Sequence, residues 1–145
     1  MAGTKTAGKV NDFDRRCKSM GNPNVAIKDR FVEAVFSGDH DTLRALIDPS
    51  FELHQPDGLP YEGIYKGSDG FLNFLDKFMA AYDLESLDET ALYVEDSNPD
   101  RLALGFHIKG RMKGDGRSFD SPQFETWDFR DGKLVNIRVF WYKLP

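Results

Sequence analysis

The sequence has little of what metal sites and disulfides require. It contains one cysteine, Cys17, and three scattered histidines among 145 residues. A single cysteine cannot close an internal disulfide, and histidines so far apart do not give the spacing of zinc ligands. We therefore expect no metal site, no structural disulfide, and a reducing, cytoplasmic location.

Long apolar runs and an excess of positive charge are also missing. No stretch approaches the roughly 20 apolar residues that span a bilayer, and the N-terminus has no apolar leader. Nineteen basic and twenty-four acidic residues give a net charge of −5, which does not favour nucleic acid or an anionic membrane. The segment GSDG at 67–70 lacks the spacing of a dinucleotide-binding loop. We expect neither nucleic acid nor a membrane as partner, and no cofactor.

Aromatic residues, by contrast, are plentiful. They make up 13% of the chain, within a hydrophobic fraction of 40%, and can line a core or a pocket. The length is that of one domain. Residues 1–22 are polar and without periodicity, so we interpret them as a flexible arm, or as a segment that packs on a partner subunit. Residues 23–145 form the predicted domain.

Three segments repeat apolar residues at helical spacing, and residues that commonly begin or end helices lie at their boundaries. They are residues 24–37, begun by Asn24 and ended by Gly38; residues 39–48, begun by Asp39 or Asp41 and ended by Pro49; and residues 68–82, begun by Ser68.

The other segments alternate as strands do. SFELHQP predicts a strand that Pro56 ends, and the Gly- and Pro-rich stretch 57–67 predicts a loop. After residue 83 four alternating segments follow, with hairpin signals at Asp115-Gly116 and Asp131-Gly132. Helices followed by hairpins predict an α+β fold with the helices on one face of a curved antiparallel sheet.

The order of elements also resembles a known family. The segments SGDHDTLRALIDPSFELHQP, GLPYEGIYKGSDGFLNFL and FETWDFRDGKLVNIRVFWY resemble the SnoaL-like and ketosteroid-isomerase-like branch of the nuclear-transport-factor-like superfamily, over residues 24–142. The resemblance implies a cone-shaped half-barrel: a curved mixed or antiparallel sheet with three N-terminal helices packed on its concave face. It also implies an apolar pocket at the open end. Members include isomerases, dehydratases, lyases, cyclases and proteins without catalysis.

The catalytic positions of ketosteroid isomerases are mostly replaced here. The general base precedes the proline that ends the first strand, and that position holds Gln55. The oxyanion-binding tyrosine of the first helix corresponds to Phe31, while the second acid corresponds to Glu125. One position of three is retained, so steroid isomerisation is not expected. The resemblance to limonene-epoxide hydrolases implies that Gln55 could orient a water.

Glu125 is the principal catalytic candidate. It shares a strand face with Trp127, and burial among rings would raise its pKa towards neutrality, as general acid–base catalysis requires. The alternative is an exposed strand glutamate in a surface ion pair. Tyr61 and Tyr65, in the loop expected to roof the pocket, could stabilise developing negative charge or simply pack.

The remaining candidates are substrate contacts and two lower-ranked histidines. Lys28 could face an anionic substrate or lie in solvent. His54 and His107 alternate out of phase with the pocket face and rank lower as catalysts. The proposed apolar contacts are Phe31, Phe78, Met112, Trp127 and Trp141.

Together these features predict a cofactor-independent enzyme, a lyase, dehydratase or isomerase, that moves protons on a small apolar, aromatic or cyclic metabolite. The alternative is a non-catalytic binding or assembly module with the same fold. Convergence of two or more polar groups in one apolar pocket would favour the enzyme. Apolar residues on the opposite sheet face, among them Phe124, Phe140 and Tyr142, predict a homodimer through that face.

Overall fold

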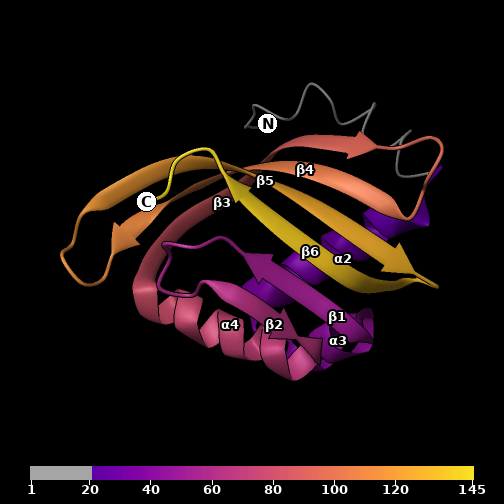
Figure 1. Ribbon diagram of the computed structural model, residues 1–145, viewed down its shortest axis with the longest axis horizontal. Helices are drawn as coiled ribbons and strands as arrows, with labels where there is room; N and C mark the ends of the chain where they lie inside the picture. Colours follow the sequence, from indigo (N-terminus) through magenta and orange to yellow (C-terminus); the bar gives the residue numbers. More distant parts are fainter. Residues whose placement is uncertain (1–20) are drawn as a thin grey trace.

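A computed structural model describes residues 21–145 (Figure 1). The predicted arm lies outside the described residues except for its last two. Of these, Asn22 is buried, caps the first described helix and donates from its amide to the carbonyl of Pro99 at 3.0 Å. The folded domain therefore includes Asn22. Within the described part of the chain, no helix is long and apolar enough to cross a membrane.

Helix α2 (Pro23–Ser37) begins one residue before its predicted start. The side chain of Asn22, not Asn24, accepts the capping hydrogen bond, from the backbone N–H of Asn24 at 2.9 Å. A proline at the first helical position fits this start, because its missing N–H has no intrahelical partner there. Gly38 ends the helix with φ 72°, as predicted.

Helices α3 (His40–Leu46) and α4 (Gly67–Ala81) depart from prediction at their ends. Asp39 caps α3 as expected, but the helix stops before Pro49, because Ile47 already pairs with Leu134 in the sheet. Lys66 precedes α4 without any side-chain cap. Ser68, the predicted cap, lies inside that helix.

The sheet has six strands in the order β2-β1-β6-β5-β4-β3. Neighbouring strands are antiparallel except β1 and β6, which are parallel. The sheet is therefore mixed, as the family resemblance allowed, whereas the pattern alone had indicated an antiparallel sheet. The strands are β1 (Ile47–Gln55), β2 (Gly63–Lys66), β3 (Tyr82–Val94), β4 (Arg101–Met112), β5 (Ser118–Arg130) and β6 (Lys133–Trp141).

Strand β2 was predicted as loop. Its four residues pair with the end of β1, His54 opposite Ile64 and Gln55 opposite Gly63, although the surrounding segment is rich in Gly and Pro. A short edge strand of this kind takes its order from its neighbour rather than from its own residues. The second predicted hairpin is confirmed, with Asp131 at φ 51° and Gly132 at φ 77°.

Figure 1 shows the helices on one face of the curved sheet, and the buried apolar core is formed by residues of both layers. In β4, four alternate apolar residues are buried, and the residues between them are more exposed, as the alternation predicted. The α+β architecture is confirmed. The four buried residues are Leu102, Leu104, Phe106 and Ile108.

Candidate active site

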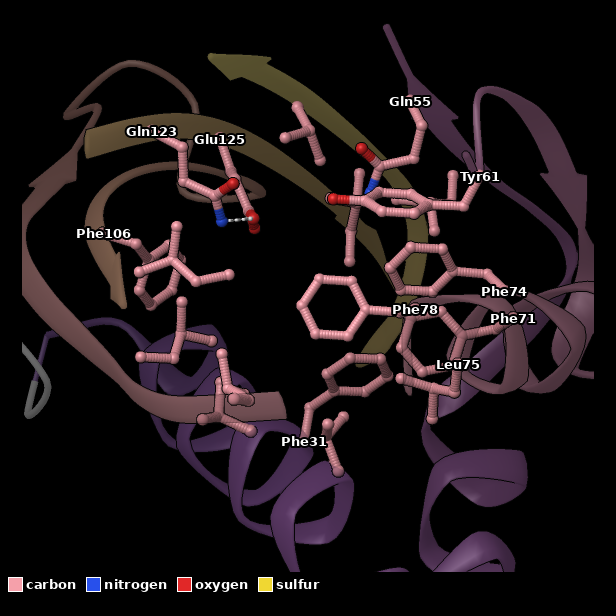
Figure 2. Close-up of a pocket in the computed structure, with 18 of the residues that line it drawn as sticks. Phe31, Gln55, Tyr61, Phe71, Phe74, Leu75, Phe78, Phe106, Gln123 and Glu125 are labelled. Carbon is pink, nitrogen blue, oxygen red and sulfur yellow. Dashed lines mark hydrogen bonds between the residues drawn. The ribbon is translucent and has the colours of Figure 1, made fainter. Parts of the chain in front are cut away.

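A pocket lies between helices α2 and α4 and the inner face of the sheet (Figure 2). The space between its walls, counted together with the open solvent at its mouth, is about 770 Å³. Most of its walls are apolar and many are aromatic rings. The polar side chains of the lining are few, and Figure 2 shows Gln55, Tyr61, Gln123 and Glu125 directed into one end of it.

The carboxyl group of Glu125 is held by its own strand. Alternation along β5 places Gln123, Glu125 and Trp127 on the inner face. One carboxyl oxygen, Oε2, accepts from Gln123 Nε2 at 3.0 Å, and the other, Oε1, accepts from Trp127 Nε1 at 2.8 Å. Two donors therefore fix the orientation of the carboxyl group inside an apolar pocket.

The surroundings of Glu125 make it a weak acid. Burial raises the pKa of this carboxyl to about 7, and the hydrogen bond from Trp127, which lowers the pKa, offsets only part of that effect. Near neutral pH both the acid and the carboxylate are populated. A group in that state can accept a proton and return it.

Gln55 lies in the same row of the sheet as Glu125. Glu125 of β5 pairs with Val139 of β6. On the other side of β6 runs the parallel strand β1, where His54 lies opposite Arg138, so the next residue, Gln55, lies beside Val139. The two backbones are thus two strands apart, roughly 10 Å. Gln55 Oε1 is buried and has no hydrogen-bond partner among the described residues. A ligand hydroxyl between these side chains could donate to the Gln55 oxygen or to the Glu125 carboxylate.

Tyr61 brings a neutral phenol to this end of the pocket. Its hydroxyl donates to the hydroxyl of Tyr82 at 3.1 Å, and burial raises the pKa of Tyr61 well above its ordinary value of 10. Tyr65 lies outside the pocket lining; its hydroxyl donates to the carbonyl of Tyr61 at 2.9 Å and so steadies the Tyr61 backbone.

Lys28 does not reach the pocket. It is fully buried but forms ion pairs with Asp29, at 2.6 Å, and with Glu89 of β3. The contact with Glu89 joins α2 to the edge strand β3. Met112 is also absent from the lining, whereas the other four predicted contacts belong to it: Phe31, Phe78, Trp127 and Trp141.

Both predicted histidines lie outside the pocket lining. His54 Nε2 is 2.9 Å from an oxygen of Glu52, and His107 Nε2 is 2.5 Å from an oxygen of Asp120. Among residues 21–145, no three His, Cys, Asp or Glu side chains are grouped so that they could hold a metal ion.

The sequence prediction missed Gln123. This residue is buried, lines the pocket and donates to Glu125. The signal was present in the sequence, because two residues of separation on a strand puts both side chains on one face. Gln123 also pairs across the sheet with Trp141, whose Nε1 is buried without a partner in the described chain.

Comparison with known proteins fits this geometry. The SnoaL-like domain family matches residues 29–137. The chain belongs to the SnoaL-like family. No curated protein matches it.

Solved structures show the same fold at low sequence identity. An NTF2-like protein from Burkholderia xenovorans LB400 has a TM-score of 0.71 and 23% identity, with 81% of this chain and 88% of that one covered. TerC, co-crystallised with polyporic acid, has a TM-score of 0.71 and 17% identity, covering 82% and 91%. A candidate SnoaL-like polyketide cyclase from Jannaschia sp. CCS1 has a TM-score of 0.68 and 19% identity, with 82% of this chain and 85% of that one covered. At these identities the likeness shows the fold.

Proposed function

We propose that this SnoaL-like protein is a cofactor-independent enzyme in which Glu125 moves a proton on a small cyclic or aromatic metabolite. The observation that carries the proposal is the Glu125 carboxyl, which lies partly buried among apolar walls, is oriented by two hydrogen-bond donors and has its pKa raised to about 7. A family that includes a candidate polyketide cyclase supports an enzymatic role.

The chemistry begins with the carboxylate form of Glu125. It takes a proton from a carbon beside a substrate carbonyl, and the electron pair of the broken C–H bond moves inward to give an enolate. The oxygen that gains negative charge lies near Gln55 and Tyr61. The Gln55 N–H can donate to it, and the Tyr61 O–H can do so by turning away from the Tyr82 hydroxyl, which then donates to Tyr61.

The protonated Glu125 then completes the reaction. Returning the proton to a different carbon gives isomerisation, while giving it to a departing hydroxyl completes loss of water. The apolar walls exclude water, which strengthens each of these polar interactions. The same group serves as base and then as acid, as a pKa near 7 allows.

A stand-in substrate tests the proposal without knowledge of the natural one. In D₂O, the protein is expected to accelerate exchange of the hydrogens beside the carbonyl of 1-indanone for deuterium. The exchange is measured by the loss of their ¹H NMR signal. Glu125→Gln should slow the catalysed exchange by roughly 10²–10⁴-fold, the usual contribution of general acid–base catalysis. The amide can keep both hydrogen bonds if the Gln123 amide rotates, so the pocket keeps its shape.

Asp128→Asn is the matched control, since Asp128 belongs to the same strand but pairs with Arg101 outside the pocket lining. It should leave exchange unchanged within about twofold. Exchange by the glutamine variant at the wild-type rate would show that Glu125 is not the base. If the wild type accelerated hydrogen exchange with none of several ring ketones, the result would favour the non-catalytic binding module.

We also propose a homodimer through the outer face of the sheet. Phe124 and Phe140 face each other across β5 and β6, and their exposed fractions are 40% and 47%. Tyr93 lies beside Phe124, with ring centroids 6.3 Å apart, and Tyr142 is more exposed still. Such a patch favours a partner surface of the same kind. Sedimentation equilibrium at micromolar concentration should give twice 16.5 kDa, and a single 16.5 kDa species would contradict the dimer.

A further inference from the structure

The walls of the pocket pass from buried to exposed along its length. Lining residues on the central strands, such as Leu53 and Ile108, are almost completely buried. On the helices the lining ends at Phe36, 50% exposed, and Met79, 41% exposed. Because these two side chains belong to the lining and also face solvent, they mark its mouth.

The edge strand β3 completes this mouth. Leu84 and Leu87 both line the pocket, although a spacing of three would place them on opposite faces of a regular strand. The register of β3 against β4 shifts between Leu84 and Ser86, and this irregularity turns both leucines inward. The mouth therefore lies between α2, α4 and the free edge of β3.

The polar and apolar lining residues are separated in space. Every lining residue contributed by α2, α4 and β3 is apolar, while the polar lining residues come from β1, β5 and the segment after β1. In Figure 2 the polar side chains Gln55 and Glu125 lie at one end, and Phe31 and Leu75 at the other. The pocket is polar at one end and apolar at the end that opens between the helices.

We infer that the pocket takes an elongated amphiphile: an oxygen-bearing ring held by Glu125 and Gln55, with an apolar substituent that leaves between α2 and α4. Phe36 and Met79 determine specificity for that substituent. The inference rests on the proposed function only for the position of the ring. Burying apolar atoms against these two exposed side chains removes both surfaces from water, which favours binding.

The 4-alkylphenols from 4-ethylphenol to 4-hexylphenol provide the probe, with dissociation constants measured by calorimetry on the full chain. Each added methylene that contacts the mouth should tighten binding about fourfold, the factor that corresponds to burying one CH₂ group. Phe36→Ser and Met79→Ser should each reduce this gain to about twofold per methylene, while the affinity for 4-ethylphenol stays unchanged.

Ile64→Ser is the matched control. Ile64 is an equally exposed apolar residue, at 55%, but it lies on β2 at the other edge of the sheet and outside the lining. It should leave the whole series unchanged. Affinity that does not rise with chain length in the wild type would overturn the inference, as would an equal loss for short and long phenols in the two mouth variants.

Glu125→Gln separates this inference from the proposed function. It should shift the affinities of all the phenols together, because it changes only the contact with the hydroxyl, and leave the gain per methylene intact. Normal chain-length dependence together with undiminished proton exchange by this variant would refute the proposed function and keep the inference. If Phe36→Ser changed only self-association, the mouth would be a protein contact and the inference would be wrong.

Discussion

The two faces of strand β5 carry acidic residues in opposite circumstances. On the outer side, Asp120 lies 2.5 Å from His107 and Asp128 lies 2.6 Å from Arg101, and both pairs are partly exposed to solvent. On the inner side, Glu125 has two neutral donors and an apolar pocket, and its pKa rises to about 7.

The contrast shows how a sheet produces a reactive carboxyl group. Because successive side chains on a strand point to opposite faces, moving a carboxyl group by one residue moves it from solvent to the apolar interior. Hydrogen bonds from Gln123 and Trp127 satisfy the oxygens of Glu125 without supplying a full positive charge. The group is oriented like a partner in an ion pair yet keeps its proton near neutral pH, because desolvation penalises the charged form.

The largest expected effect on stability is its dependence on pH. The pKa of Glu125 is raised above the ordinary value of 4.5, so between pH 4.5 and about 7 the folded protein binds more protons than the unfolded chain. The contribution of Glu125 to the free energy of unfolding should therefore fall as pH rises through this range, by about 3 kcal/mol, and then level off. Glu125→Gln has no carboxyl to ionise, so its free energy of unfolding relative to that of the wild type should increase from pH 4.5 to pH 8.

Urea unfolding of both proteins at several pH values measures this difference. Asp128→Asn serves as the control on the outer face, where loss of an exposed ion pair should cost about 1 kcal/mol or less. A constant difference between Glu125→Gln and wild type from pH 4.5 to pH 8 would contradict the burial of an ionisable group at this position.

A smaller effect is expected at the indole that donates to Glu125. Trp127→Phe removes the hydrogen bond that lowers the pKa of Glu125, so that pKa should rise further, with a loss of about 1–2 kcal/mol in stability. Trp141→Phe is the control, because Trp141 lines the same pocket but its Nε1 has no partner among the described residues. It should leave the pKa unchanged. Equal pKa values in the two variants would argue against the role of the Trp127 donor.

The sequence predicted the elements whose signals are local. Alternation in β4, the glycine after α2 and the Asp131-Gly132 turn each follow from a few neighbouring residues, and the structure agrees. The missed features depend on residues far along the chain. Ile47 leaves the helix because it pairs with Leu134, and β2 exists because β1 offers it an edge.

In the candidate site, too, local patterns indicated some positions, while others depend on residues far along the chain. Strand parity grouped Glu125 with Trp127 on one face but left open which face lines the pocket, and the structure shows that both residues line it; the same rule would have added Gln123 to that group. Lys28 could not be placed by helical spacing alone, because its position depends on Glu89, 61 residues away, which pairs with it. The row that brings Gln55 near Glu125 depends on the parallel pairing of β1 with β6, which no local pattern indicates.

The titration of Glu125 itself tests the central claim most directly. In protein labelled with ¹³C at the glutamate carboxyl carbon, one NMR resonance should be absent from Glu125→Gln. In the wild type that resonance should move with a midpoint at about pH 7. A midpoint near the ordinary value of 4.5 would show a carboxylate that stays ionised at neutral pH, and the account of Glu125 as a proton donor and acceptor would be wrong.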